Sequence, residues 1–121
     1  MLFRSLAIVA AITAGTWGLL RDSVNLAMDA VPDGIELAQV EAALRALPGI
    51  VEVHDLHVWG LSTTETALTA HLVQDGAGDP CPLLQLATAC VRERFRIGHA
   101  TFQVETAEMA IGCELRPDHV V

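Results

Sequence analysis

Sixteen consecutive residues without a charged side chain, 5–20, lie between Arg4 and Arg21 near the start of the chain. A helix needs about 20 apolar residues to cross a bilayer, so this span is marginal by itself. No small-residue cleavage site of a secretory signal follows, and apolar residues continue at helical spacing. We interpret residues 1–30 as the end of a membrane helix that runs into a polar linker, with Trp17 and Arg21 at the lipid boundary. The alternative is an amphipathic helix packed on its own domain.

The charge balance of the chain is acidic, with fifteen Asp and Glu against seven Arg, no Lys, and a formal net charge of −8. Such a surface repels phosphate groups, so we expect no nucleic-acid partner. It attracts cations, although a merely solubilising surface has the same composition.

The cysteines, Cys81, Cys90 and Cys113, are odd in number and form no CxxC motif, which is typical of a reducing compartment rather than of a disulfide framework.

The order of the sequence patterns predicts an α+β domain. Apolar residues at helical spacing are followed by the helix-ending pair Pro48 and Gly49, and then by runs of β-branched residues. The predicted elements are a helix at 37–47, strands at 50–61 and 67–73 joined as a hairpin, a helix at 82–96 and a strand at 100–106. Two helices on one face of a small sheet would bury these apolar stripes together. From Ala107 onward the pattern fades into a tail.

The stretch VHDLHVWGL, residues 53–61, places two histidines and an aspartate within the first predicted strand. Side chains alternate between the faces of a strand, so His54 and His57 are expected on opposite faces unless a bulge intervenes. His57 shares its face with Asp55 and Trp59, which favours a structural cluster over a ligand role. The alternation assigns no role to His54.

Polar residues of the other strands suggest a metal site. His71 and Glu105 are expected on the uncovered face of the sheet, with His54 and His99 at strand edges. Imidazole and carboxylate together suit Zn²⁺ and neighbouring divalent transition metals, but each residue, taken singly, is more typical of a solvated sheet face. The sequence has no nucleophile motif, no phosphate-binding glycine loop and no HExxH, so we do not expect an enzyme.

The motifs VHDLHVW, TAHLV and FQVE, in this order, resemble those of the cation diffusion facilitators, and most closely the zinc–cobalt–cadmium resistance branch. The resemblance covers about residues 10–106. It implies a ferredoxin-like domain of the metallochaperone type that binds metal and forms a homodimer. That domain would end a six-helix transporter of the cell inner membrane, which exports divalent metal in exchange for protons. The implied parts are the last membrane helix at 1–20, a linker at 21–34, the cytoplasmic domain at 35–106 and a tail at 107–121.

The resemblance also implies which residues bind the metal, with Zn²⁺ expected and Co²⁺ or Cd²⁺ as alternatives. The matching ligand positions are His54, His71, Glu105 and His99. The last match is incomplete, because relatives often have two adjacent histidines where this chain has Gly98 and His99. Some members add a pair of tail cysteines, and Cys113 matches one of them.

The membrane helices that form the family's transport site do not occur in this sequence. The chain is therefore expected to be either a piece of a transporter or a free-standing relative of its regulatory domain. The alternative function is a metal-independent, ferredoxin-like dimerisation module, in which His54 and His71 only form hydrogen bonds.

Overall fold

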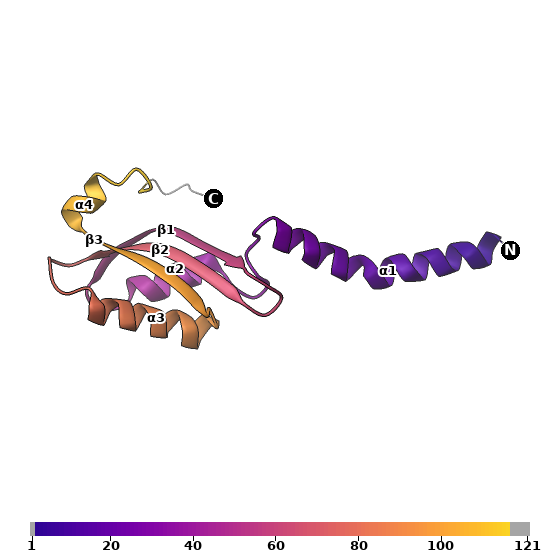
Figure 1. Cartoon of the computed structure of the whole chain (residues 1–121), viewed down its shortest axis with the longest axis horizontal. Coiled ribbons are helices and arrows are strands. Elements are labelled where there is room, and N and C mark those ends of the chain that lie inside the picture. Colours follow the sequence, from indigo (N-terminus) through magenta and orange to yellow (C-terminus); the bar gives the residue numbers. More distant parts are fainter. Residues whose placement is uncertain (1, 117–121) are drawn as a thin grey trace.

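The structure, a computed structural model, describes residues 2–116. Its elements are α1 Leu2–Ala27, α2 Leu37–Arg45, β1 Ile50–Gly60, β2 Thr66–Gln74, α3 Cys81–Phe95, β3 His99–Thr106 and α4 Ala107–Ile111 (Figure 1). The α+β fold expected from the sequence is confirmed. One helix precedes the domain, and one short helix follows its last strand.

Helix α1 projects away from the rest of the molecule and has no buried residue (Figure 1). Its 26 residues, at about 1.5 Å each, span about 39 Å, which exceeds the roughly 30 Å of a bilayer's hydrocarbon core. Among the described residues it is the one helix that is long and apolar enough to cross a membrane. The helix continues without a break past Arg21, so the charged residues after the apolar span belong to the same helix.

The sheet has three strands in the order β1-β2-β3. Strands β1 and β2 form the expected antiparallel hairpin, whereas β2 and β3 run parallel. Parallel neighbours need a crossover connection, and α3 supplies it. The last strand therefore lies beside β2 and away from β1, and β2 is the central strand.

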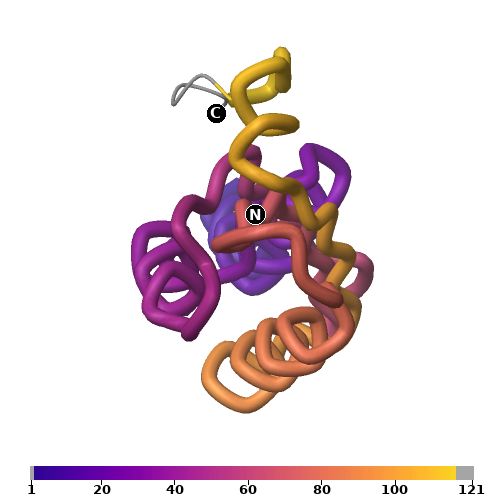
Figure 2. The backbone as a smooth tube through the Cα atoms, turned by 90° about the vertical axis from the view of Figure 1, so that its left-hand side faces the viewer, coloured from indigo at the N-terminus to yellow at the C-terminus, as the bar shows by residue number. Residues whose placement is uncertain are grey.

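Helices α2 and α3 cover one face of the sheet (Figures 1 and 2). Each helix presents fully buried residues four positions apart, Val40 and Leu44 in α2 and Ala87 and Val91 in α3. The strand residues that pack in the same core are Val53, Val58, Leu68, Ala70 and Leu72. Because strand side chains alternate, the intervening polar residues of β2 and β3 lie on the opposite face.

Helix α4 lies at the start of the tail, where the sequence pattern fades after residue 106. The Thr106 hydroxyl accepts a hydrogen bond from the Met109 amide, at 3.4 Å, and so caps the helix N-terminus. Ala110 is 1% exposed and anchors the helix to the domain. A helix of five residues has no periodicity that the sequence could reveal. It lies on the side of the sheet opposite α3 (Figures 1 and 2).

Candidate metal centre

Two histidines meet on the face of the sheet opposite α2 and α3. His54 of β1 lies directly across from His71 of β2, and cross-strand partners share a face. The two rings meet edge-on, with centroids 5.0 Å apart. The side chain of His54 is 3% exposed and that of His71 is 12% exposed, so both imidazoles are largely withdrawn from water.

A β-bulge next to this pair changes the alternation along β1. His54 pairs with His71 and His57 pairs with Thr69. The β1 segment between these two pairs is therefore one residue longer than the β2 segment opposite it. Val53 and Val58 are consequently both buried, although an odd number of positions separates them. His57 therefore faces the same side of the sheet as His54, and strict alternation fails in this strand. The bulge includes Asp55, whose φ of 50° lies in the left-handed region.

The expected contact between His57 and Asp55 is present, with 3.0 Å between His57 Nε2 and Asp55 Oδ1. It lies at the rim of the site rather than in the core, because the His57 side chain is 36% exposed. His57 supplies none of the clustered donor atoms described below.

Glu105, the third residue expected at the site, reaches the two histidines from β3. Its Oε1 lies 2.9 Å from His71 Nδ1, and its Oε2 lies 3.5 Å from His54 Nε2. The amide of Gln103 donates a hydrogen bond to Oε1 at 2.7 Å. Glu105 is 2% exposed, and a buried carboxylate is costly unless it is paired or binds a cation.

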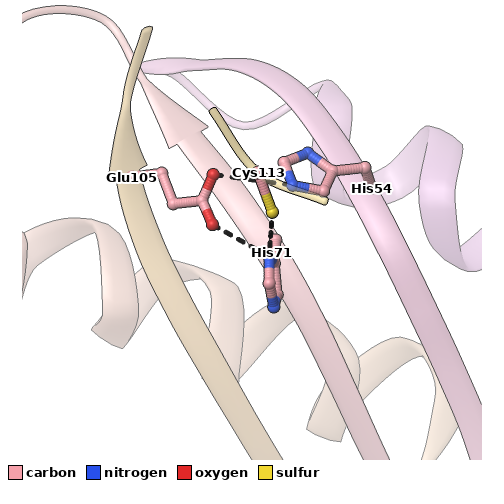
Figure 3. A group of neighbouring side chains, drawn as sticks. All are labelled: His54, His71, Glu105 and Cys113. Carbon is pink, nitrogen blue, oxygen red and sulfur yellow. Dashed lines mark hydrogen bonds and ion pairs between the residues drawn. The ribbon is translucent and has the colours of Figure 1, made fainter. Parts of the chain in front are cut away.

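The segment after α4 adds a sulfur atom to this group (Figure 3). Cys113 Sγ lies 3.7 Å from His71 Nδ1. One donor atom from each of His54, His71, Glu105 and Cys113 lies within 4.8 Å of the other three. The strand patterns did not suggest Cys113 as a metal-binding residue. In the sequence, only its match to a tail cysteine of the family pointed to such a role.

The same segment is tied to β1 by an ion pair. Arg116 donates two hydrogen bonds to the carboxylate of Glu52, at 3.1 and 3.0 Å. This guanidinium holds the pKa of the Glu52 carboxyl below its usual value. Glu52 Oε1 in turn lies 3.6 Å from His54 Nδ1. The tail therefore contacts the site through Cys113 and lies near it again through Glu52, which is beside His54.

His99 lies away from these four residues. It begins β3 and pairs with Ala67, whereas His71 pairs with Gln103 four residues further along the strand, a separation of about 13 Å. Its side chain is 57% exposed, and its Nε2 lies 3.8 Å from Glu65 Oε1. The structure thus brings together three of the four sequence-suggested ligands and leaves His99 at the other end of the sheet.

The unpaired atoms of this cluster fit a divalent metal. Among the described residues, both ring nitrogens of His54 and the Oε2 of Glu105 are buried without a hydrogen-bond partner. A tetrahedral Zn²⁺ site separates neighbouring donors by roughly 3.3–3.8 Å, given bonds of about 2.0–2.3 Å. The distances from His54 Nε2 to Glu105 Oε2, 3.5 Å, and from Cys113 Sγ to His71 Nδ1, 3.7 Å, lie in that range. Two nitrogens, one oxygen and one sulfur suit Zn²⁺ and its softer neighbours.

The family description "Cation efflux protein, cytoplasmic domain" matches residues 32–107. The chain therefore belongs to the cation efflux family, and the matched residues include three of the four clustered side chains, His54, His71 and Glu105. The metal-bound C-terminal domain of the CzcD transporter from Cupriavidus metallidurans has the same fold. Its TM-score is 0.55 at 38% identity, and the match covers 59% of this chain and 99% of that one.

Curated relatives belong to bacteria and to eukaryotes. The cation efflux system protein CzcD of Alcaligenes sp. (strain CT14) is 40% identical over 93 residues, which cover 76% of this chain and 29% of CzcD. The vacuolar zinc transporter TgZnT of Toxoplasma gondii is 34% identical over 99 residues, covering 82% of this chain and 11% of TgZnT. The chain thus spans less than a third of the length of either relative.

Proposed function

We propose that this chain is a metal-binding regulatory domain of a divalent-cation efflux system, with Zn²⁺ held by His54, His71, Glu105 and Cys113. The observation that carries the proposal is the buried cluster of four donors, in which Glu105 Oε2 and both ring nitrogens of His54 have no hydrogen-bond partner among residues 2–116. A bound cation would supply what these atoms lack, since buried polar groups are otherwise costly. Co²⁺ and Cd²⁺ accept the same donors. The metal-bound state of the related CzcD domain supports this proposal.

In this proposal metal binding regulates the transporter by changing the repulsion between two acidic copies of the domain. Two copies of a domain with this acidic excess repel each other, and a cation bound in each copy reduces that repulsion. Metal binding would then favour a closed homodimer and, through α1, bias the inward-facing and outward-facing states of attached membrane helices. Such a shift requires different metal affinities in the two states. In this proposal residues 1–20 lie in the inner membrane, 21–34 form the linker, and the 35–106 domain and the 107–121 tail are cytoplasmic.

Calorimetric titration of the full chain in detergent micelles with Zn²⁺ tests the proposal. We expect saturable binding of one ion per chain, because the described residues contain one such donor cluster. Protons compete for imidazole and thiolate, so the affinity should fall as the pH is lowered through about 6.5. Absence of binding at neutral pH would refute the metal function and leave the metal-independent dimerisation module.

The thiol of Cys113 should become unreactive when the metal binds. Alkylation requires a free thiolate, so saturating Zn²⁺ should slow the modification of Cys113 on the order of tenfold or more. Cys81 and Cys90 lie outside the cluster and serve as internal controls within the same molecule. Mass spectrometry resolves the three sites. Equal slowing at all three cysteines, or no slowing at Cys113, would remove Cys113 from the proposed ligands.

Cys81 should show a different pH dependence, unrelated to metal. The neighbouring Asp79 carboxylate raises the pKa of the Cys81 thiol through a hydrogen bond and through its charge. Asp79→Asn removes the charge but keeps an oxygen that caps the Cys81 amide, so the pKa should fall. Alkylation of Cys81 near neutral pH should then be faster than in the natural chain. The control is Asp75→Asn in the same exposed loop, and superimposable pH–rate profiles for all three proteins would contradict the prediction.

A further inference from the structure

The two ring nitrogens of His71 face different partners. Nδ1 lies 2.9 Å from Glu105 Oε1 and 3.7 Å from Cys113 Sγ, so it faces the donor cluster. Nε2 faces Asp55, whose Oδ2 lies 3.7 Å away. A neutral imidazole that ligates a metal through one nitrogen carries its proton on the other. If Nδ1 is the ligand atom of His71, then Nε2 is the N–H group, and it points at a carboxylate.

Asp55 is held in place from its other side. Its Oδ1 lies 3.0 Å from His57 Nε2, and its side chain is 14% exposed. The carboxylate therefore bridges His57 at the rim and His71 in the site. Outer carboxylates of this kind fix the ring orientation and the tautomer of a ligating histidine. Closure of the Asp55–His71 distance by about 0.5 Å brings the pair into the N–H···O range.

The backbone of β1 is distorted at the residue that supplies this carboxylate. In a regular strand Asp55, which follows His54, would point to the opposite face and into the apolar core. The bulge and the left-handed φ of 50° turn it toward His71 instead. The left-handed region is less favourable for a residue with a Cβ than for glycine, but aspartate adopts it more often than most residues do.

We infer that Asp55 is a positioning residue of the metal centre: it holds the His71 ring with Nε2 protonated and Nδ1 free to bind the metal. The inference rests on the proposed metal function and adds a role that the four donors do not include. In this role the bulge and the Asp55–His57 contact act together, because both hold the Asp55 carboxylate beside His71.

The test compares Asp55→Gly, which removes the carboxylate and tolerates a positive φ, with Asp29→Gly. Asp29 is an exposed aspartate with nearly the same φ, 52°, so it controls for the relief of backbone strain. We expect Asp55→Gly to weaken Zn²⁺ binding about 10–100-fold, the range for loss of an outer partner. Asp29→Gly should bind as the natural chain does. Asp55→Asn should lie between them, because its amide oxygen still accepts the Nε2–H bond.

A second measurement detects the proton on His71 Nε2 directly. In the Zn²⁺-loaded natural chain, proton–nitrogen NMR should show a His71 Nε2–H that exchanges slowly with water, and Asp55→Gly should lose this signal. Unchanged affinity or a persistent signal in Asp55→Gly overturns the inference. If that variant does not fold, natural affinity in Asp55→Asn overturns it. Zn²⁺ binding that depends on His71 but not on Asp55 refutes this inference alone, whereas no binding by the natural chain refutes the proposed function as well.

Discussion

Replacing His71 by alanine should lower the affinity of the chain for Zn²⁺ by more than the roughly 10–100-fold that loss of an outer-shell partner costs. His71 is the centre of the cluster, because its Nδ1 lies near both Glu105 and Cys113 while its ring meets that of His54. Its removal takes away one of the proposed ligands and also the side chain that contacts two others. Calorimetric titration of the natural and variant chains measures the change.

His99→Ala is the matched control for this experiment. It makes the same substitution at a histidine that is exposed and lies at the far end of the sheet, so Zn²⁺ affinity should not change. Circular dichroism of both variants checks that the fold survives. Equal affinities in His71→Ala and the natural chain would contradict the proposed site. A loss in His99→Ala as large as that in His71→Ala would show that His99 acts on the metal from a position that the cluster does not explain.

Replacing Leu72 by alanine should destabilise the domain by about 2–5 kcal/mol, the usual range for a large buried aliphatic side chain. Leu72 is fully buried in the core beneath α2 and α3, and it follows His71 on the central strand. The side chains of His71 and Leu72, which are adjacent on β2, thus lie on opposite faces of the sheet: His71 in the donor cluster and Leu72 in the core. Urea unfolding followed by the fluorescence of Trp59, in a Trp17→Phe background, measures the change.

Leu86→Ala provides the control for the core substitution. Leu86 is 45% exposed on α3, so the same chemical change should alter stability by no more than about 0.5 kcal/mol. If Leu72→Ala unfolds at the same urea concentration as Leu86→Ala, then the packing of the sheet against the two helices does not stabilise the domain as described.

Local patterns were sufficient to predict the helices and strands other than α4, and two of the four clustered residues. The helical spacing of Val40 and Leu44 predicts which face of α2 is buried, because packing along a regular helix follows a fixed period. Strands β2 and β3 keep their alternation through the site. His71 and Glu105 could therefore be assigned to the uncovered face from parity alone, and the structure has them 2.9 Å apart there.

The bulge in β1 could not be read from the sequence. An extra residue is accommodated where it allows Val53 and Val58 to reach the same core, and that condition depends on packing against the helices and on pairing with β2. Strict alternation therefore put His57 on the wrong face. It also gave no reason to bring Asp55 to the same side as His54, which is where the structure has it.

The position of the tail was equally inaccessible from local patterns. Cys113 reaches His71, 42 positions earlier, because α4 docks through Ala110 and Arg116 pairs with Glu52, 64 positions earlier. His99 shows the converse, since it lies on the same strand as Glu105, yet the parallel register puts it beside Ala67 and away from His71. The sequence by itself determined the fold class and the two clustered residues on regular strands, His71 and Glu105, since period and parity are local properties. Only the tertiary structure decided the bulge, the fourth donor and the exclusion of His99 from the cluster, because register and docking depend on contacts between residues distant along the chain.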